Sequence, residues 1–388
     1  MDRPSKPSIL RVVIAPDSFK ECLPADQVAS AIARGWRKAA PDDDIVEVPL
    51  ADGGEGTTVA LTEARQGQLH SVTVAGPLGN PVTAHYGLVD NGRVAIVEVA
   101  EGSGLHCVPA TARDALNASS FGTGELMLAA LAHGPDTLVM GLGGSATTDG
   151  GAGILQALGA RLLDQQGQDI PPGGAGLARL ASLDLEPALD RFADTRLVVA
   201  CDVSNSLLGP DGAAAIFGPQ KGADAGQVQQ LDDNLAHFAR LVRALGMDID
   251  SFPGSGAAGG IGGMIAGVLD AELRPGIELV METVALERHV RQADLVITAE
   301  GAIDSQSAHG KTPAGVSALA KKYGVPVIGL AGKLGGELQG LHDLGLSAAF
   351  SITPAPVALQ EAYAKASENL EQCAEQLARL VHSLSDRS

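Results

Sequence analysis

Five stretches of the sequence combine glycine with acidic, hydroxyl or lysine side chains, and each lies at or shortly after a short apolar run. They are APDSFKE (15–21), ADGGEGT (51–57), GLGGSATTDGGAG (141–153), ACDVSNSLLGPDGAAAIFGPQKGA (200–223) and EGAIDSQSAHGKTP (300–313). Short apolar runs of this kind predict buried strands. Ligands of open α/β sheets bind beyond the carboxyl ends of the strands. Position and composition therefore both indicate that these stretches bind ligands or take part in catalysis.

The glycine-rich stretch 141–153 is typical of a phosphate-binding turn. It lies between a predicted strand and a predicted helix, where backbone N–H groups and the helix dipole favour an anion. Ser145 and Thr147 add hydroxyl donors. The pattern Gly141-x-Gly143-x-x-Ala146, with Asp164 at the end of a later apolar run, leaves a dinucleotide-binding turn as the alternative. Three further glycines early in the predicted helix favour the phosphate-binding turn over that alternative.

Acidic residues in three of the stretches could hold a metal ion or accept a proton. Glu300 and Asp304 lie just past a predicted strand, and such carboxylates suit Mg²⁺ together with phosphate oxygens and water. Asp202 also ends a predicted strand and could be a base or a metal ligand, with a capping role as the alternative. Asp52 and Glu55 bracket a glycine pair, which indicates either close approach of a ligand or a tight turn with a helix cap.

The end of the stretch 300–313 resembles the end of a P-loop. The P-loop pattern requires glycine five residues before Gly310, and position 305 is serine. Thr312 followed by proline predicts the start of a helix. Because a lysine at the positive end of a helix is unfavourable without a nearby anion, Lys311 indicates an anion site that is not a P-loop.

Two further residues could bind an anionic substrate, and several common hydrolase signatures are missing. Ser18 and Lys20 directly follow the predicted strand 10–16. The nine histidines form no HExxH pattern, and no serine lies in a G-x-S-x-G elbow. The sequence therefore gives little support to a metalloprotease or a serine hydrolase.

Strand and helix patterns alternate at both ends of the chain. Predicted strands occupy 10–16, 44–52, 294–301, 325–332 and 346–354, and predicted helices occupy 27–39, 313–323, 335–344 and 358–384. Such alternation predicts a parallel sheet with helices on both faces.

The middle of the chain has a different pattern. Residues 71–100 form alternating segments split by turn signals, which predicts an antiparallel meander. The fold class is therefore α/β with two domains. A Rossmann-like parallel-sheet domain comes from both chain ends, 1–75 and 286–388, and a mixed α/β domain is inserted between them at 76–285. A simple split near residue 200 is the alternative.

Composition limits the classes of partner. The 388 residues carry a net charge of −19, which argues against binding to nucleic acid or to an anionic membrane surface. No apolar run approaches the roughly 20 residues that span a bilayer. The four cysteines are scattered, as is common in a reducing compartment. We therefore expect a cytoplasmic protein with a small-molecule substrate.

Taken together, these motifs resemble the bacterial glycerate kinase family, whose members use ATP to phosphorylate D-glycerate. Two more stretches share the resemblance, SSFGTGEL (119–126) and GSGAAGGIGG (254–263), so that it covers nearly the whole chain in order. The usual family string Thr-Gly-Glu-Gly-Arg is replaced by TAEGA at 298–302, and alanine stands where the family has arginine. The resemblance also implies the two-domain architecture described above.

The resemblance implies a set of roles for phosphoryl transfer from ATP to glycerate, with Mg²⁺ as a cofactor and the 2-hydroxyl as the expected acceptor. Asp202 would be the base, with Asp52 or Glu55 as alternatives beside the substrate, and Lys311 would balance the transferring charge. Glu300 and Asp304 would hold Mg²⁺. The remaining roles are phosphate binding by Gly143, Gly144, Ser145 and Thr147, and binding of the glycerate carboxylate by Ser18 and Lys20.

Two other functions and the assembly state remain open at this point. A nicotinamide-dependent hydroxy-acid dehydrogenase would use the turn from Gly141 to Ala146. A non-catalytic binder of small phosphorylated ligands would explain the alanine at position 302. We expect a monomer or a homodimer.

Overall fold

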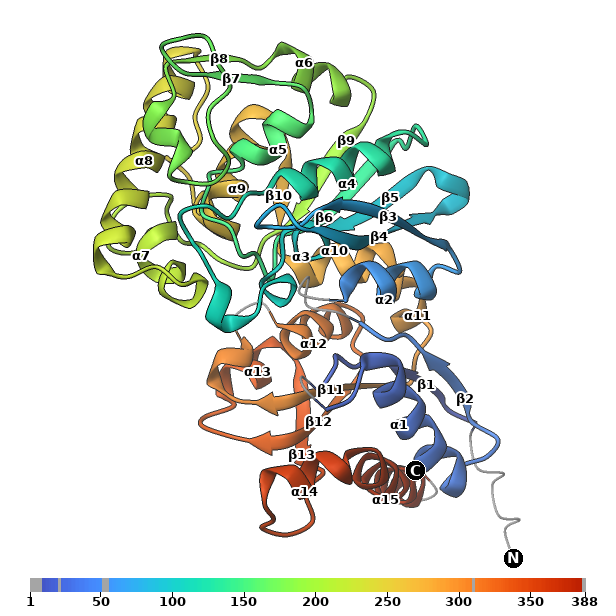
Figure 1. The fold of residues 1–388 in the computed structure, drawn as a ribbon. Coiled ribbons are helices and arrows are strands. Elements are labelled where there is room, and N and C mark those ends of the chain that lie inside the picture. The colour runs from blue at the N-terminus through green and yellow to red at the C-terminus, as the bar shows by residue number, and fades with distance from the viewer. Residues whose placement is uncertain (1–8, 20–21, 51–55, 309–310, 386–388) are drawn as a thin grey trace, which may run out of the picture. The chain divides into compact units, whose positions relative to one another are not determined.

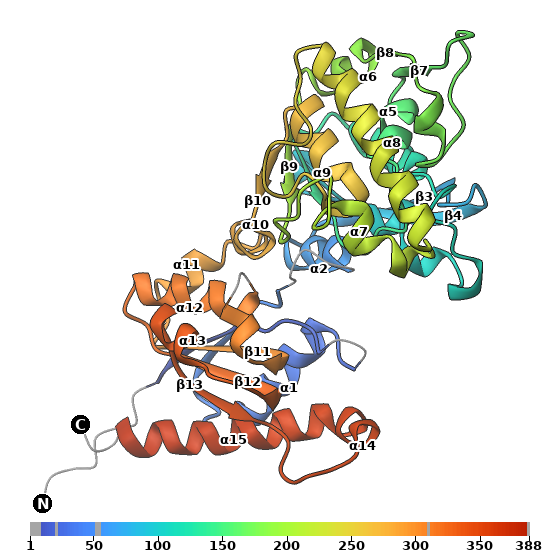
Figure 2. The same ribbon diagram turned by 90° about the vertical axis from the view of Figure 1, so that its left-hand side faces the viewer.

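The structure is a computed structural model that describes residues 9–19, 22–50, 56–308 and 311–385. Contacts divide the chain into two compact units, residues 1–52 with 277–388 and residues 53–276. Each unit combines a central sheet with packed helices (Figures 1 and 2), which confirms the predicted fold class. No helix in the described residues is both long enough and apolar enough to cross a membrane.

The first unit contains a five-stranded sheet in which every neighbouring pair is parallel. Its order is β13-β12-β11-β1-β2. The strands are β1 (Arg11–Ile14), β2 (Asp44–Glu47), β11 (Leu295–Ile303), β12 (Val327–Leu334) and β13 (Leu346–Ser351). Both ends of the chain thus supply strands to one sheet, as the alternating pattern predicted.

Helices cover both faces of this sheet (Figure 1). One face carries α1 (Ala25–Ala39) and α15 (Ala366–Ser385), and the other carries α12 (Thr312–Lys322) and α13 (Gln339–Leu344). The unit also contains α10 (Gly276–Thr283), α11 (Leu286–Val290) and α14 (Leu359–Ala364). The predicted helix 358–384 is therefore two helices, since the helical conformation is interrupted at Lys365.

The apolar positions of α1 explain its place on the sheet. Val28, Ile32 and Trp36 recur every four residues, and all three are fully buried. They pack in one cluster with Val12 and Ile14 of β1. The apolar residues that recur at helical spacing in the sequence thus face the core, as predicted.

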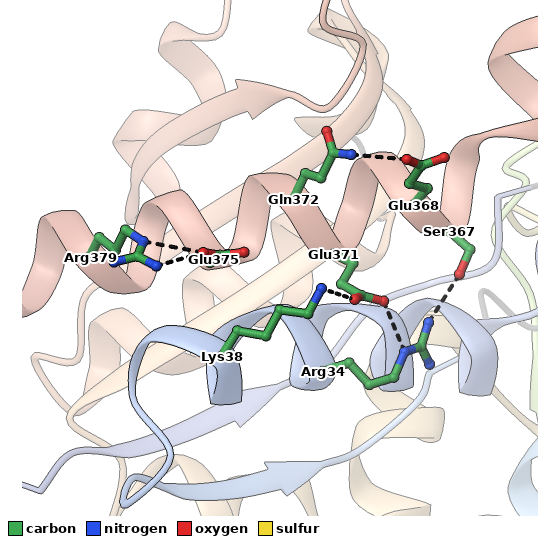
Figure 3. Close-up of polar contacts among 8 residues, drawn as sticks. All are labelled: Arg34, Lys38, Ser367, Glu368, Glu371, Gln372, Glu375 and Arg379. Carbon is green, nitrogen blue, oxygen red and sulfur yellow. Dashed lines mark hydrogen bonds and ion pairs between the residues drawn. The ribbon is translucent and has the colours of Figure 1, made fainter.

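Helix α15 is joined to α1 by polar contacts and by close backbone packing (Figure 3). Arg34 Nε lies 3.0 Å from a carboxylate oxygen of Glu371, which also pairs with Lys38. A second Arg34 nitrogen donates to Ser367 Oγ at 3.1 Å. At Gly35 a Cβ atom would lie 2.0 Å from the backbone oxygen of Glu371, so only glycine permits this approach. These contacts fasten the C-terminal helix to the N-terminal part of the unit.

The second unit contains a six-stranded mixed sheet in the order β10-β9-β6-β5-β4-β3. The strands are β3 (Gln68–Ala75), β4 (Pro81–Val89), β5 (Val94–Glu98), β6 (Thr137–Gly141), β9 (Arg196–Ala200) and β10 (Glu272–Arg274). Strands β3, β4 and β5 form the predicted antiparallel meander, and β5, β6, β9 and β10 run parallel. Strand β3 pairs with β4 along its whole length, so residues 53–75 belong to this unit rather than with the chain ends.

The helices of the second unit differ in length. They are α2 (Thr57–Ala64), α3 (Val99–Ser103), α4 (Phe121–Leu131), α5 (Ala152–Ala157), α6 (Glu186–Leu189), α7 (Ala213–Phe217), α8 (Ala225–Ala244) and α9 (Ala257–Val268). A separate hairpin joins β7 (Arg161–Leu163) and β8 (Ser182–Asp184). Helix α8 begins with a capping box between Asp224 and Gln227, which satisfies two backbone donors.

Candidate active site

The carboxyl end of β1 places Asp17 and Ser18 at the edge of the five-stranded sheet. Asp17 is 4% exposed, and its carboxylate accepts hydrogen bonds from the Ser18 N–H at 2.6 Å and from Thr312 Oγ1 at 2.7 Å. The sequence analysis selected Ser18 but missed Asp17. The available signal was its position as the first acidic residue after a buried strand.

Lys311 and Glu300 form an ion pair at the same edge, with 2.9 Å between Nζ and Oε1. Glu300 is 9% exposed, and its other oxygen accepts a hydrogen bond from Ser307 Oγ at 3.3 Å. Lys311 is the N-cap residue of α12, where the sequence analysis expected Thr312. The negative group that a lysine requires at a helix start is therefore present within the chain, and it is Glu300.

A pocket of about 300 Å³ lies at the ends of β11 and β12. Its lining combines one acid, Asp304, and one lysine, Lys333, with Ile303 and the small residues Ala302, Ser305, Gly335 and Gly336. Ala302 and Lys333 are register partners on β11 and β12. Lys333 is exposed and forms no ion pair with another described residue. Position 302, where the family has arginine, is therefore next to a cation, Lys333, on the neighbouring strand β12.

The carboxylates predicted to hold Mg²⁺ have suitable oxygen donors. Glu300 has one oxygen paired with Lys311, and Asp304 lines the pocket. Among the described residues, no three His, Cys, Asp or Glu side chains gather as a metal cluster. A Mg²⁺ ion at this edge would therefore depend on phosphate oxygens and water for most of its ligands, which is its usual mode of binding.

The six-stranded sheet has its own row of chemically relevant residues at the carboxyl edge. Glu98, Gly141, Ala200 and Arg274 lie in register across β5, β6, β9 and β10. The glycine-rich turn directly follows Gly141, and Asp202 lies two residues after Ala200. The sheet therefore brings Glu98, the turn and Asp202 to one edge.

The glycine-rich turn is held by its neighbour segment and leaves some N–H groups open. The N–H of Leu105 donates to the oxygen of Gly144 at 2.8 Å, and the N–H of Ala146 donates to the oxygen of Ser103 at 2.8 Å. Gly144 has a φ of +73°, which favours glycine. Within the described part of the chain, the N–H groups of Gly143 and Gly144 have no acceptor. The turn is thus fixed on one side and able to bind an anion on the other.

A buried lysine lies behind this turn. Lys221 is 3% exposed, and its ammonium group donates to Ser145 Oγ at 2.9 Å and to the oxygen of Thr147 at 2.6 Å. Burial lowers the pKa of Lys221 to about 7, although the charge of Asp149 opposes that change. The sequence analysis missed this contact. The one signal in the sequence is that Lys221 is the only lysine between Lys38 and Lys311.

Asp149 organises the start of the helix that follows the turn. Its carboxylate accepts four hydrogen bonds, from Ser120 N–H at 2.8 Å, Ser120 Oγ at 2.9 Å, Gly151 N–H at 3.1 Å and Gly153 N–H at 3.3 Å. Complete burial raises the pKa of Asp149, and these donors partly offset that effect. Asp149 therefore fixes the direction in which the turn leaves the sheet.

Asp202 and Glu98 occupy different environments at the same edge. Asp202 is exposed, and its carboxylate accepts the N–H of Gly276 at 2.7 Å. Glu98 is almost fully buried and accepts N–H groups from Gly56, at 3.1 Å, and from Thr58 at the start of α2. Burial raises the pKa of Glu98 to about 7, and the hydrogen bonds from Thr58 oppose the change. The sequence analysis did not select Glu98.

The remaining predicted residues divide into two groups. Lys20, Asp52 and Glu55 lie outside the described residues. Asp164, on which the dinucleotide alternative rested, pairs with Arg179 and accepts N–H groups within the β7–β8 hairpin. Strand β7 is not part of the six-stranded sheet. Asp164 therefore does not end a neighbouring parallel strand, as a dinucleotide-binding turn would require.

Comparison with known proteins identifies the family. The sequence model of the glycerate kinase family matches residues 12–382. The chain belongs to the glycerate kinase family. It is therefore an ATP-dependent kinase, and the dehydrogenase and non-catalytic alternatives are not retained. A glycerate kinase of Bacillus subtilis is 49% identical over 373 residues, which is 96% of this chain and 98% of the relative.

Two further members of the family are similarly close. A glycerate 2-kinase of Escherichia coli is 48% identical over 362 residues, covering 93% of this chain and 95% of the relative. A crystal structure described as glycerate kinase 2 from Salmonella typhimurium has 47% identity and a TM-score of 0.88, covering 97% of this chain and 99% of that one. The glycerate kinase family fold therefore extends over nearly the whole chain.

Proposed function

We propose that this glycerate kinase phosphorylates the 2-hydroxyl group of D-glycerate, giving 2-phosphoglycerate and ADP from ATP. The Escherichia coli relative, at 48% identity, carries the name glycerate 2-kinase, which supports this choice of hydroxyl. The structural observation that best supports phosphoryl transfer is the glycine-rich turn, because the N–H groups of Gly143 and Gly144 have no acceptor within the described residues.

At the edge of the six-stranded sheet, the proposed roles are phosphate binding and proton removal. The N–H groups of Gly143 and Gly144, together with the hydroxyl groups of Ser145 and Thr147, bind phosphate oxygens. Asp202 accepts the proton of the 2-hydroxyl as its oxygen attacks the γ-phosphorus and ADP leaves. Exposure leaves this carboxylate accessible to a substrate.

At the edge of the five-stranded sheet, the proposed roles concern charge and the substrate carboxylate. Ser18 and Lys20 bind the glycerate carboxylate, and Asp52 and Glu55 lie beside the bound glycerate. Lys20, Asp52 and Glu55 fall outside the described residues. Lys311 balances charge on the transferring phosphoryl group. Glu300 and Asp304 would hold Mg²⁺, which would supply neutralisation of phosphate charge.

A coupled assay for ADP tests the proposal. Purified protein with ATP, Mg²⁺ and D-glycerate should release ADP well above a control without glycerate. Phosphorus NMR then identifies the product, and 2-phosphoglycerate is the expected signal. A signal from 3-phosphoglycerate alone would refute the choice of hydroxyl while leaving the kinase activity intact. Absence of both products would refute the proposed reaction.

Two expectations from the sequence remain predictions. The four cysteines form no disulfide bond with one another, which suits the expected cytoplasmic location. Fractionation of cells that produce the protein would test this location. Light scattering on the purified protein would decide between the expected monomer and homodimer.

A further inference from the structure

Lys221 stands apart from the other cationic residues of its unit. Residues 39–310 contain no other lysine, and arginine supplies the remaining strong cations there. Lysine is almost never fully buried without a paired acid, yet Lys221 is 3% exposed. A position this costly for a charged group requires an explanation beyond packing.

The contacts of Lys221 do not neutralise it. Its two hydrogen-bond acceptors, Ser145 Oγ and the oxygen of Thr147, are uncharged. Among the described residues, no carboxylate lies within ion-pair distance of Nζ. Asp149 attracts the ammonium group from further away, but its carboxylate already accepts four other hydrogen bonds. The charge of Lys221 is therefore only partly compensated.

Polar groups around the turn also lack partners. The hydroxyl groups of Thr147 and Thr148 are buried, and neither has a hydrogen-bond partner among the described residues. Unsatisfied buried hydroxyl groups are uncommon and are often explained by a ligand or water. They lie in the same turn whose carbonyl group contacts Lys221, so the charge and the unpartnered donors are in one place.

We propose that Lys221 is a positioning residue for phosphoryl transfer, which fixes the 143–148 turn from inside and supplies the positive charge that an anionic phosphate group on that turn requires. The inference rests on the proposed function and adds a cation to its phosphate site. Binding of the phosphate group and protonation of the lysine should favour each other, because each stabilises the charge of the other.

The proposal makes the affinity for ATP dependent on pH. Because burial lowers the pKa of Lys221 to about 7, the ammonium form is present below that pH and is lost above it. Asp149 is the charged group that attracts Lys221. Arg113 contacts the residue before it, with its guanidinium donating to the oxygen of Gln220 at 2.9 Å, and Glu98 at the same sheet edge also has a pKa of about 7. The ratio kcat/KM for ATP should therefore fall as the pH rises through 7.

Lys221→Met tests the proposal, with Lys365→Met as the matched control on the exposed surface of α14–α15. Methionine has a similar length and is apolar, so it should fit the buried site without loss of thermal stability. We expect kcat/KM for ATP to fall by about 10², the usual effect of removing one preorganised donor. The KM for glycerate should change little, and the fall of kcat/KM for ATP as the pH rises through 7 should be clearly smaller than in wild type, with any remainder due to Glu98.

Several outcomes would overturn the proposal. A folded Lys221→Met enzyme with normal kcat/KM for ATP contradicts it, and so does one in which kcat/KM changes near pH 7 as much as in wild type. Titration calorimetry with ATP alone separates this result from a failure of the proposed reaction, because it needs no turnover. If wild-type protein makes no phosphoglycerate, the proposed function fails, whereas a difference in ATP affinity between wild type and Lys221→Met still supports the role of the lysine.

A measurement on wild-type protein covers the case in which Lys221→Met does not fold. In protein labelled with ¹³C-lysine, one resonance should titrate near pH 7, and its midpoint should move upward on addition of ATP. A midpoint that is unchanged at saturating ATP would contradict the proposal, since the bound phosphate groups would then not interact with the lysine charge.

Discussion

The charged side chains at the carboxyl edges of the two sheets have different kinds of partner. At the five-stranded sheet, charged side chains pair with groups of the same edge, as Lys311 does with Glu300 and Asp17 with Thr312. At the six-stranded sheet, the cation Lys221 contacts only uncharged oxygens, and the turn in front of it leaves N–H groups open. The charge of Lys311 is thus neutralised by an acid of its own edge, whereas the charge of Lys221 is only partly compensated.

This difference indicates which edge depends on its ligand. Removing one member of the pair at the first edge leaves a buried charge without a partner, so stability should suffer along with activity. For Lys221, at the second edge, the proposed partner is a phosphate group of ATP. Substitution of Lys221 should therefore change ATP binding and its pH dependence more than stability.

The largest expected effect comes from Asp202→Asn. A general base typically contributes a factor of about 10²–10⁴, so kcat should fall by roughly that amount. Asp211→Asn, an exposed acid of the same segment, serves as the control. If Asp202 serves only to accept the N–H of Gly276, the variant should instead lower the melting temperature and leave kcat nearly unchanged.

Lys311→Met should lower kcat by about 10²–10³, by analogy with the loss of one preorganised transition-state donor. Lys321→Met, at the other end of α12, is the control. The double variant Glu300→Gln with Lys311→Met sharpens the comparison. It should regain thermal stability, because the buried charge is removed, but not activity. Recovery of kcat as well would mean that the ion pair is purely structural.

Glu98→Gln should change how stability depends on pH. The folded-state pKa of Glu98 is raised from 4.5 to about 7, so the folded protein binds the proton more tightly than the unfolded chain. This contribution to stability is fully present below pH 4.5 and is lost as the pH rises to 7, by up to about 1.4 kcal/mol per pH unit.

Urea unfolding at several pH values between 4.5 and 7 measures this effect. The Glu98→Gln protein should show a smaller decline than wild type, and the exposed Glu63→Gln variant should match wild type. Equal declines in all three proteins would show that Glu98 titrates normally. Lys221 does not confuse the measurement, because its lowered pKa affects stability above pH 7, where it makes stability rise with pH.

Ala302→Arg is expected to have the smallest effect. It restores the arginine of the family string beside Asp304, but Lys333 already places a cation in the same pocket. We expect a small rise in kcat/KM, and a larger rise in the background Lys333→Met. If arginine lowers the value in both backgrounds, the pocket has adapted to alanine and the cation of β12 does not replace it.

Sequence reasoning identified segments better than contacts. The turn 141–153 and Asp202 could be located because their signals, an apolar run followed by glycine or acid, are local in the chain. The contact between Lys221 and Ser145 joins residues 76 positions apart, and the bond between Glu98 and Gly56 joins residues 42 positions apart. Nothing local in the sequence shows which side chains such distant segments will bury together. The burial that sets the pKa values of both residues could not be predicted for the same reason.

The sequence by itself determined the strand and helix pattern, the α/β class and the positions of the ligand-binding stretches, because periodicity and turn chemistry act over a few residues. Only the tertiary structure decided that Lys311 is neutralised by Glu300 while Lys221 is buried without an acidic partner. Both are lysines that follow glycine-containing segments, and their sequences do not distinguish them. Their environments differ because the charge on each depends on which strands and helices pack around it.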